Sequence, residues 1–67
     1  YISLRKGGTF VQAAVTEDGY LMEYRDGSGY YESAEQDLSE SKVKVVMYGF
    51  LDDDKGWKKE IDWEKLD

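Results

Sequence analysis

The stretch from Asp37 to Leu51, DLSESKVKVVMYGFL, decides the fold, because no other part of the chain keeps a helical period over several turns. Apolar residues spaced at i, i+3, i+4 and i+7 lie along one side of a helix. In this stretch those positions are Val43, Val46, Met47 and Phe50, and the next residue, Leu51, widens the stripe. We therefore predict a helix over about residues 38–51 whose apolar stripe packs on a sheet.

Both ends of this helix have sequence signals. Asp37 can accept hydrogen bonds from the first free backbone N–H groups, and Glu40, three residues later, can reach back to complete a capping box. The three acids Asp52, Asp53 and Asp54 would oppose the helix dipole at its C-terminus, so the helix should end before them.

Four segments before the helix alternate apolar and polar residues, the pattern of strands with one buried face. They are predicted at about residues 2–6, 9–15, 20–25 and 30–34. Glycine-containing turns separate them: Gly7-Gly8, Asp18-Gly19 and Asp26-Gly27-Ser28-Gly29. Strands joined by such short turns form an antiparallel meander, which can expose one face to water.

The alternation also predicts which side chains face the helix. The inward set is Val11, Ala13, Val15, Tyr20, Met22 and Tyr24. The outward set is Phe10, Gln12, Ala14, Leu21, Glu23 and Arg25. Tyr30 and Tyr31 are adjacent, so on a strand they should point to opposite faces.

The tail at residues 57–66 fits two patterns. A short helix would use Trp57, Ile61 and either Trp63 or Leu66, and a strand would use Ile61, Trp63 and Lys65. We expect a helical turn near residues 57–59, then an extended end, with both tryptophans closing the core. The chain, residues 1–67, is thus predicted to be one α+β domain: a four-stranded antiparallel meander, one main helix on one face, and a short C-terminal segment closing the core.

The composition limits the possible functions. A chain of 67 residues forms one domain near the lower size limit for independent folding. It contains no cysteine and no histidine, which rules out disulfides and suits a reducing compartment, so we expect a cytoplasmic protein. No apolar run is long enough to span a membrane, and we expect no membrane partner.

Acidic residues are concentrated in the second half of the chain. The net charge is −6; residues 1–31 contain four acids and three bases, whereas residues 32–67 contain eleven acids and six bases. This balance argues against nucleic-acid binding, which needs lysine and arginine to displace counterions. It favours a basic partner, steered toward the acidic half. The alternative is that the acids only keep a small domain soluble.

Residues for catalysis or metal binding are scarce, and we expect no enzyme activity, cofactor or metal. The serines have no histidine to act as a base, and there is no cysteine nucleophile. A calcium-binding loop beginning at Asp52 would need an acid or amide at its fifth position, glycine at its sixth and glutamate at its twelfth. The chain has Gly56, Trp57 and Trp63 there.

Ten aromatic residues are more than a core of this size readily accommodates. The outward face of the sheet would carry Phe10, Ala14, Leu21 and one tyrosine, rimmed by Glu23, Arg25 and Glu32. Aromatic and arginine anchors inside a polar rim are typical of protein interfaces. The alternative is a face partly covered by the C-terminal tail.

Several phrases of the sequence resemble a known group of proteins. They are LMEYRDG at residues 21–27, Asp37-Leu38 at the start of the helix, the acids at 52–54 followed by Trp57, and IDWE at residues 61–64. Together they resemble small, mostly uncharacterised bacterial proteins similar to the immunity proteins of polymorphic toxin systems. This resemblance implies a cytoplasmic α+β binding protein with a toxin as its partner. It supplies no functional residue to transfer.

The residues and the resemblance lead to one main hypothesis and two alternatives. The main hypothesis is a non-enzymatic protein-binding module that neutralises a basic, nuclease-like toxin. Its candidate binding residues are Phe10, Leu21, Tyr30, Tyr31, Glu32, Glu35, Asp37, Glu40, Asp52, Asp53 and Asp54. The first alternative is a homodimer formed through the outward sheet face or a free edge. The second is a small-molecule binder that uses the aromatic face.

Overall fold

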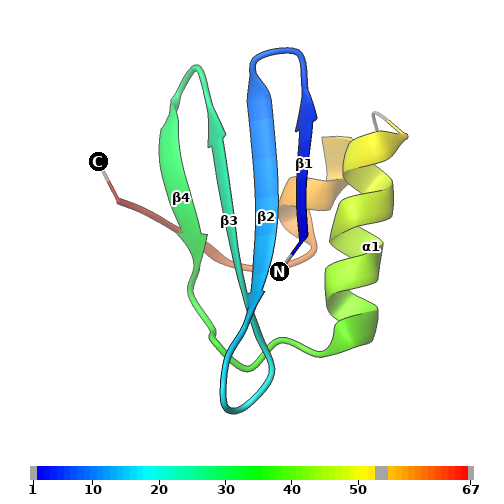
Figure 1. Cartoon of the computed structure of the whole chain (residues 1–67). Helices are drawn as coiled ribbons and strands as arrows, with labels where there is room; N and C mark the ends of the chain where they lie inside the picture. The colour runs from blue at the N-terminus through cyan, green and yellow to red at the C-terminus, as the bar shows by residue number, and fades with distance from the viewer. Residues whose placement is uncertain (1, 53–54, 67) are drawn as a thin grey trace.

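Each strand of the sheet pairs with the next strand along the chain, in an antiparallel order β1-β2-β3-β4-β5. The computed structural model describes residues 2–52 and 55–66, and for Lys55 the backbone alone. The elements are β1 (Ile2–Lys6), β2 (Thr9–Val15), β3 (Tyr20–Asp26), β4 (Gly29–Ser33), α1 (Glu40–Leu51), the 3-10 helix η1 (Lys55–Lys59) and β5 (Trp63–Lys65). Both helices lie on the same side of the sheet (Figure 1). The predicted α+β class is confirmed.

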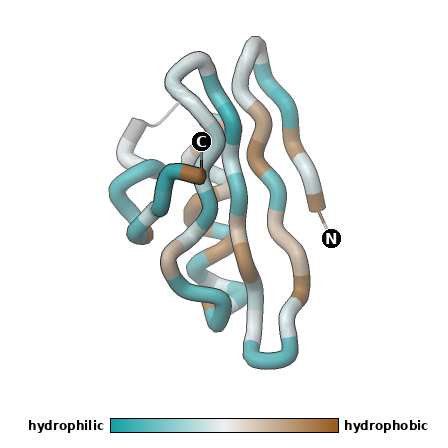
Figure 2. The backbone as a smooth tube through the Cα atoms, turned by 90° about the vertical axis from the view of Figure 1, so that its left-hand side faces the viewer, coloured by the Kyte–Doolittle hydropathy of each residue, from teal (hydrophilic) through white to brown (hydrophobic). Residues whose placement is uncertain are grey.

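The first four strands begin and end within one residue of the prediction. Their alternation is visible as changing hydropathy along the chain, and the β2–β3 turn is hydrophilic (Figure 2). The tail adds a fifth strand, which the prediction of a four-stranded sheet did not include. After the short helix η1, β5 pairs antiparallel with β4 and extends the meander to five strands. The expected helical turn followed by an extended end is therefore confirmed.

Helix α1 begins later than predicted, and its cap is a different residue. Ser39 is the N-cap, and its Oγ accepts a hydrogen bond of 3.1 Å from the backbone N–H of Lys42. The predicted Asp37–Glu40 capping box is wrong. Leu38 exchanges two backbone hydrogen bonds of 3.0 Å with Tyr20, one in each direction, and this bridge keeps the chain extended up to residue 38. The helix can start only after the bridge ends.

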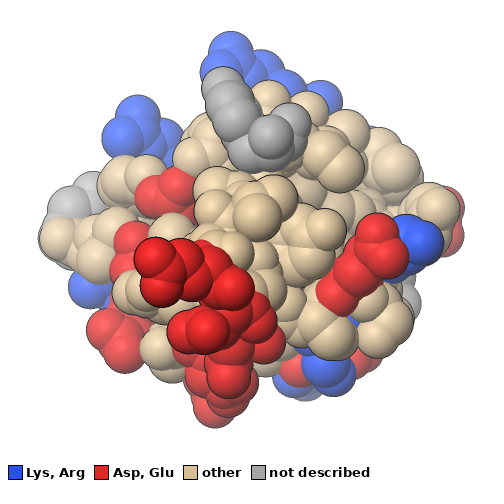
Figure 3. Space-filling model, turned by 60° about the horizontal axis from the view of Figure 1, so that its bottom comes forward, with Lys and Arg blue, Asp and Glu red and all other residues tan. Residues whose placement is uncertain are grey.

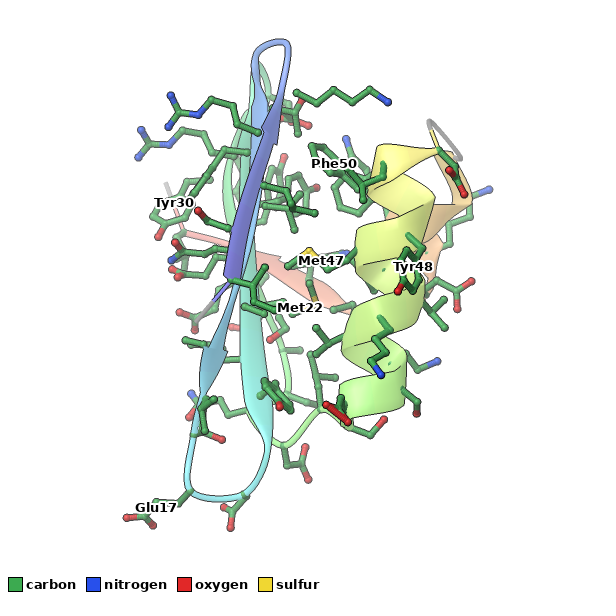
Figure 4. The ribbon with its side chains drawn as sticks, turned by 45° about the vertical axis from the view of Figure 1, so that its right-hand side comes forward. Glu17, Met22, Tyr30, Met47, Tyr48 and Phe50 are labelled. Atoms are coloured by element: carbon green, nitrogen blue, oxygen red, sulfur yellow. The ribbon has the colours of Figure 1, made fainter. Side chains whose placement is uncertain are left out.

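The core lies between the sheet and α1. The predicted helix stripe is buried, and Val11, Met22 and Val46 are completely enclosed. Figure 4 shows Met22, Met47 and Phe50 in this space, whereas Tyr48 points away from the sheet. Leu51, predicted to widen the stripe, is 48% exposed because it is the last residue of α1. Val15 lies on the predicted face, beside Val43 at the start of α1, but it is 70% exposed.

Aromatic side chains fill the end of the core that the tail closes. The ring of Tyr24 stacks on Tyr31 with a centroid distance of 4.5 Å and an interplanar angle of 13°. Trp57 and Trp63 meet the same ring edge-on at 5.1 and 4.7 Å, and Trp57 also contacts Phe50 at 5.7 Å. Burial raises the pKa of the Tyr24 hydroxyl to about 12. The prediction that both tryptophans close the core is confirmed.

A lysine of η1 fastens this short helix to the sheet. Lys58 Nζ lies 2.7 Å from Asp26 Oδ2 and also sits over the rings of Tyr24 and Trp57, at 5.1 and 5.6 Å from their centroids. Asp26 Oδ1 accepts two further hydrogen bonds, from the backbone N–H and the hydroxyl of Ser28. The hydrogen bond from Lys58, followed by those from Ser28, lowers the pKa of Asp26 from 3.8 to about 2.

We expect an NMR titration of the Asp26 carboxyl to show a midpoint near 2 instead of 3.8. Because the folded pKa is the lower one, the stabilisation by ionised Asp26 is complete above the unfolded pKa and is lost as the pH falls toward the folded pKa. Lys58→Gln should raise the midpoint, and Lys59→Gln, at the exposed neighbouring position, should leave it unchanged. If Lys58→Gln left the midpoint unchanged, the hydrogen bond from Lys58 would not be the cause of the lowered pKa of Asp26.

Candidate protein-interaction surfaces

Two loops far apart in the sequence meet at one end of the molecule. The β2–β3 turn, residues 16–19, and the segment 34–39 before α1 both lie at the lower end in Figure 1. The hydroxyl of Thr16 donates a hydrogen bond of 2.6 Å to the backbone oxygen of Gln36. The bridge between Tyr20 and Leu38 joins the same two segments. The backbone thus fixes these loops side by side.

This end carries five exposed carboxylates, and we call it the acidic end: Glu17, Asp18, Glu35, Asp37 and Glu40. Figure 3 shows acidic side chains gathered on this side of the molecule, and Figure 4 shows Glu17 at the tip of the turn. Neither residues 16–20 nor residues 34–40 include a lysine or arginine. The acidic end is therefore built from three neighbouring segments that contribute only acidic charges: the β2–β3 turn, the segment before α1, and Glu40 at the first residue of α1.

The second surface is the face of the sheet turned away from α1, and we call it the outer face. In Figure 1 the helices lie on the opposite side of the sheet, and in Figure 4 Tyr30 projects away from them. The strand register arranges its side chains in rows that run across the strands. The row that we call the basic row is Arg5, Phe10, Arg25 and Tyr30 on β1 to β4. The next row, the acidic row, is Ser3, Gln12, Glu23, Glu32 and Glu64 on β1 to β5.

In the basic row each guanidinium lies over an aromatic ring. The Arg5 guanidinium is 5.9 Å from the centroid of Phe10, and that of Arg25 is 5.0 Å from the centroid of Tyr30. These four side chains and the β1–β2 turn line a shallow hollow of about 500 Å³. Among the residues that the structure describes, neither arginine forms a salt bridge. Two positive charges are therefore available on this face.

In the acidic row Glu23 is held between two neighbours. Its Oε1 accepts a hydrogen bond of 2.5 Å from the Gln12 side-chain amide, and its Oε2 accepts one from the Tyr30 hydroxyl. The hydrogen bond to Glu23, together with burial, raises the pKa of Tyr30 above its ordinary value. The tyrosine ring is thereby fixed in position on the outer face.

The structure separates the predicted binding residues into groups. Phe10 and Tyr30 share the basic row, and Glu32 lies in the acidic row. Leu21 is on the same face, two residues beyond the acidic row along β3, opposite Ala14. Tyr31 is on the core face, stacked on Tyr24, so the prediction that the two adjacent tyrosines point to opposite faces is confirmed.

The predicted acids also divide by position. Glu35, Asp37 and Glu40 lie at the acidic end, whereas Asp52 follows the other end of α1 and is its C-cap. Asp53 and Asp54 lie outside the described residues. Sequence reasoning missed Glu17 and Asp18 as members of the acidic end. Their only sequence signal was an Asp-Gly turn, which does not show which distant loop lies beside it.

No match to this chain was found among protein families, curated proteins or solved structures. The resemblance to immunity proteins therefore stays a prediction, and the two surfaces provide the basis for a functional proposal.

Other features of the described chain are less distinctive. Within residues 2–52 and 55–66, no group of three acids, histidines or cysteines is placed to hold a metal ion. No helix in this part of the chain has the length and apolar character needed to cross a membrane. A mostly apolar groove of about 200 Å³ lies between β1, β2 and the start of α1, lined by residues that include Ile2, Val15 and Val43.

Proposed function

We propose that this chain is a non-enzymatic protein-binding module that engages a basic protein through its acidic end. The supporting observation is the meeting of Glu17 and Asp18 with Glu35, Asp37 and Glu40, all exposed, on loops joined by backbone hydrogen bonds. A single-sign surface on a rigid support attracts an oppositely charged partner and speeds its association.

The position of the acids on the fold favours such a role over mere solubility. Charges that only keep a domain soluble can be dispersed over its surface. Here the bridge between Tyr20 and Leu38 holds two acidic loops side by side, so negative charge is concentrated at one end. A cationic surface that binds there would neutralise this charge. A partner with a cluster of lysines and arginines would fit this end.

We extend the proposal to an immunity-type role in the cytoplasm, in which the partner is a basic toxin of the nuclease class. Two arguments support this extension: the resemblance of the sequence to bacterial immunity proteins, and the complementarity of a carboxylate cluster to a phosphate-binding cleft. Such a cleft attracts the carboxylates of a protein inhibitor in place of nucleic-acid phosphates. The inhibitor would act by occupying the cleft and needs no catalytic group.

Matched charge variants test the binding role. The first is Glu17→Gln, Asp18→Asn and Asp37→Asn at the acidic end. The control is Asp52→Asn, Glu60→Gln and Asp62→Asn, which removes the same charge from exposed positions outside both surfaces. Each tagged protein is used to capture partners from a bacterial lysate at about 0.05 M and about 0.5 M salt, concentrations that bracket weak and strong screening.

We expect wild type and the control variant to retain one basic protein at low salt and to release it at high salt. The acidic-end variant should retain at least about tenfold less, because steering and binding both depend on these charges. Equal retention by the two triple variants would contradict the proposal. So would the absence of any basic protein among those retained by wild type.

A further inference from the structure

The outer face places like charges next to each other on neighbouring strands. Glu23, Glu32 and Glu64 occupy directly paired positions on three neighbouring strands, β3 to β5. Like charges in directly opposed positions destabilise a sheet. Two residues further along the strands, Arg5 and Arg25 lie over aromatic rings, and neither forms a salt bridge with a described residue. Both sets of charges therefore lack partners of opposite sign within the sheet.

We infer that the outer face binds the outer face of a second copy of this chain, about a two-fold axis that runs across the strands between the two rows. The basic and acidic rows are two residues apart along each strand, which is roughly 7 Å. A two-fold axis midway between them lays the basic row of each copy over the acidic row of the other. This inference uses a different surface from the proposed function and does not depend on it.

The geometry of packed sheets suits this arrangement. Two sheets that pack face to face are about 10 Å apart, a gap that arginine and glutamate side chains can close together. With the axis across the strands, Arg25 of each copy meets the carboxylates of Glu23 and Glu32 in the other copy. Phe10 and Tyr30 lie in the same row and lose their exposure to water. Arginine and aromatic residues are enriched at such interface centres.

The same axis also keeps the most strongly repelling parts of the two copies apart. It reverses the direction of the strands, so the acidic ends of the two copies point in opposite directions. The domain is 31 Å in its longest dimension, so these ends lie well beyond a Debye length, which is about 10 Å at 0.1 M salt. A net charge of −6 on each copy therefore opposes the contact only weakly at this salt concentration.

The charge pattern favours a second copy over a nucleic acid as the occupant. A phosphate backbone on the basic row would meet the three carboxylates of the neighbouring row. A copy of the same face places Glu23 and Glu32 of each molecule against Arg25 of the other, so two sets of opposite charges meet across the axis. The sheet face spans five strands at about 4.8 Å spacing, so its footprint is roughly half of the 800 Å² per partner of standard interfaces. We therefore expect a weak dimer, since interfaces of this size belong to the low end of specific contacts.

Charge exchange between two variants tests the inference. The first variant is Arg5→Glu with Arg25→Glu, which makes the outer face wholly acidic. The second is Glu32→Lys with Glu64→Lys, which makes it mainly basic. Sedimentation velocity at about 0.1 M salt then measures the mass of wild type, of each variant and of their equimolar mixture. Near-ultraviolet circular dichroism of the two tryptophans checks that each variant is folded, and Arg5→Gln with Arg25→Gln replaces the first variant if it is not.

We expect wild type to rise from 7.8 kDa toward twice that mass as its concentration increases. Each variant alone should dissociate at least about tenfold more readily, since like charges then face each other, and the mixture should restore dimers. A wild type that stays at 7.8 kDa, or variants that associate as well as wild type, would overturn the inference. Neither result affects the capture experiment with the acidic-end variants, so the two proposals fail separately.

Discussion

Replacing Trp57 with alanine is expected to unfold most of the protein at room temperature. Trp57 is 7% exposed and contacts the rings of Tyr24, Phe50 and Trp63. Removing a buried tryptophan side chain typically costs about 3–5 kcal/mol. A domain of this size commonly has a total stability of only about 3–5 kcal/mol. The loss is therefore comparable to everything that keeps the chain folded.

Near-ultraviolet circular dichroism and urea unfolding measure this effect. The control is Tyr48→Ala on the neighbouring helix, whose side chain is 62% exposed and points away from the sheet (Figure 4). We expect the control to change the free energy of unfolding by less than about 0.5 kcal/mol. If Trp57→Ala lowered the free energy of unfolding by no more than the control does, the tail would not be part of the core.

Replacing Gly19 with alanine is expected to lower the free energy of unfolding by about 2 kcal/mol or more, through backbone strain and a steric clash. Gly19 has a φ of 154°, which L side chains rarely adopt. A Cβ at this position would lie 2.7 Å from the backbone oxygen of Leu38 and 2.9 Å from the carbonyl carbon of Asp37. The substitution would therefore push apart the two loops that form the acidic end.

Gly27 provides the matched control, because a Cβ there has no atom within 4 Å and its φ is ordinary. Gly27→Ala should alter the free energy of unfolding by no more than about 0.5 kcal/mol. Thermal unfolding of both variants tests the difference. An equal melting temperature for the two alanine variants would mean that the close approach of the two loops is unimportant for stability.

Local sequence patterns predicted the elements of this fold well. Alternation identified four strands, and the i, i+3, i+4, i+7 spacing identified the buried stripe of α1. The start of α1 was missed because it depends on a non-local contact, the bridge between Tyr20 and Leu38. The β5 strand was left open for a similar reason. Its three residues form a strand because they pair with β4, and the sequence of so short a segment does not indicate that pairing.

The candidate surfaces were predictable in part. Alternation placed Phe10, Leu21 and Arg25 on one face, and the register confirms that they share it. The rows within that face follow from the pairing register, which the sequence does not fix. The acidic end shows the same limit: its members come from three segments, and the hydrogen bond between Thr16 and Gln36 that aligns two of them is also non-local.

The two surfaces have different physical characters and suit different partners. The acidic end has one sign of charge, which favours fast, salt-sensitive association with a basic protein. The outer face has both signs in adjacent rows with aromatic rings between them, which favours a complementary face of similar pattern. In the inferred dimer the acidic ends stay exposed at opposite extremes, so one dimer could engage two partners.

The most direct test of the acidic end is the association rate of the captured basic protein, measured for three variants as a function of salt. We expect Glu17→Gln, Asp18→Asn and Asp37→Asn together to slow association about tenfold or more at low salt and to flatten its salt dependence. The control triple variant and Arg5→Glu with Arg25→Glu should stay within about threefold of wild type. If the outer-face variant associated slowly and the acidic-end variant associated as fast as wild type, the partner would bind the sheet and not the acidic end.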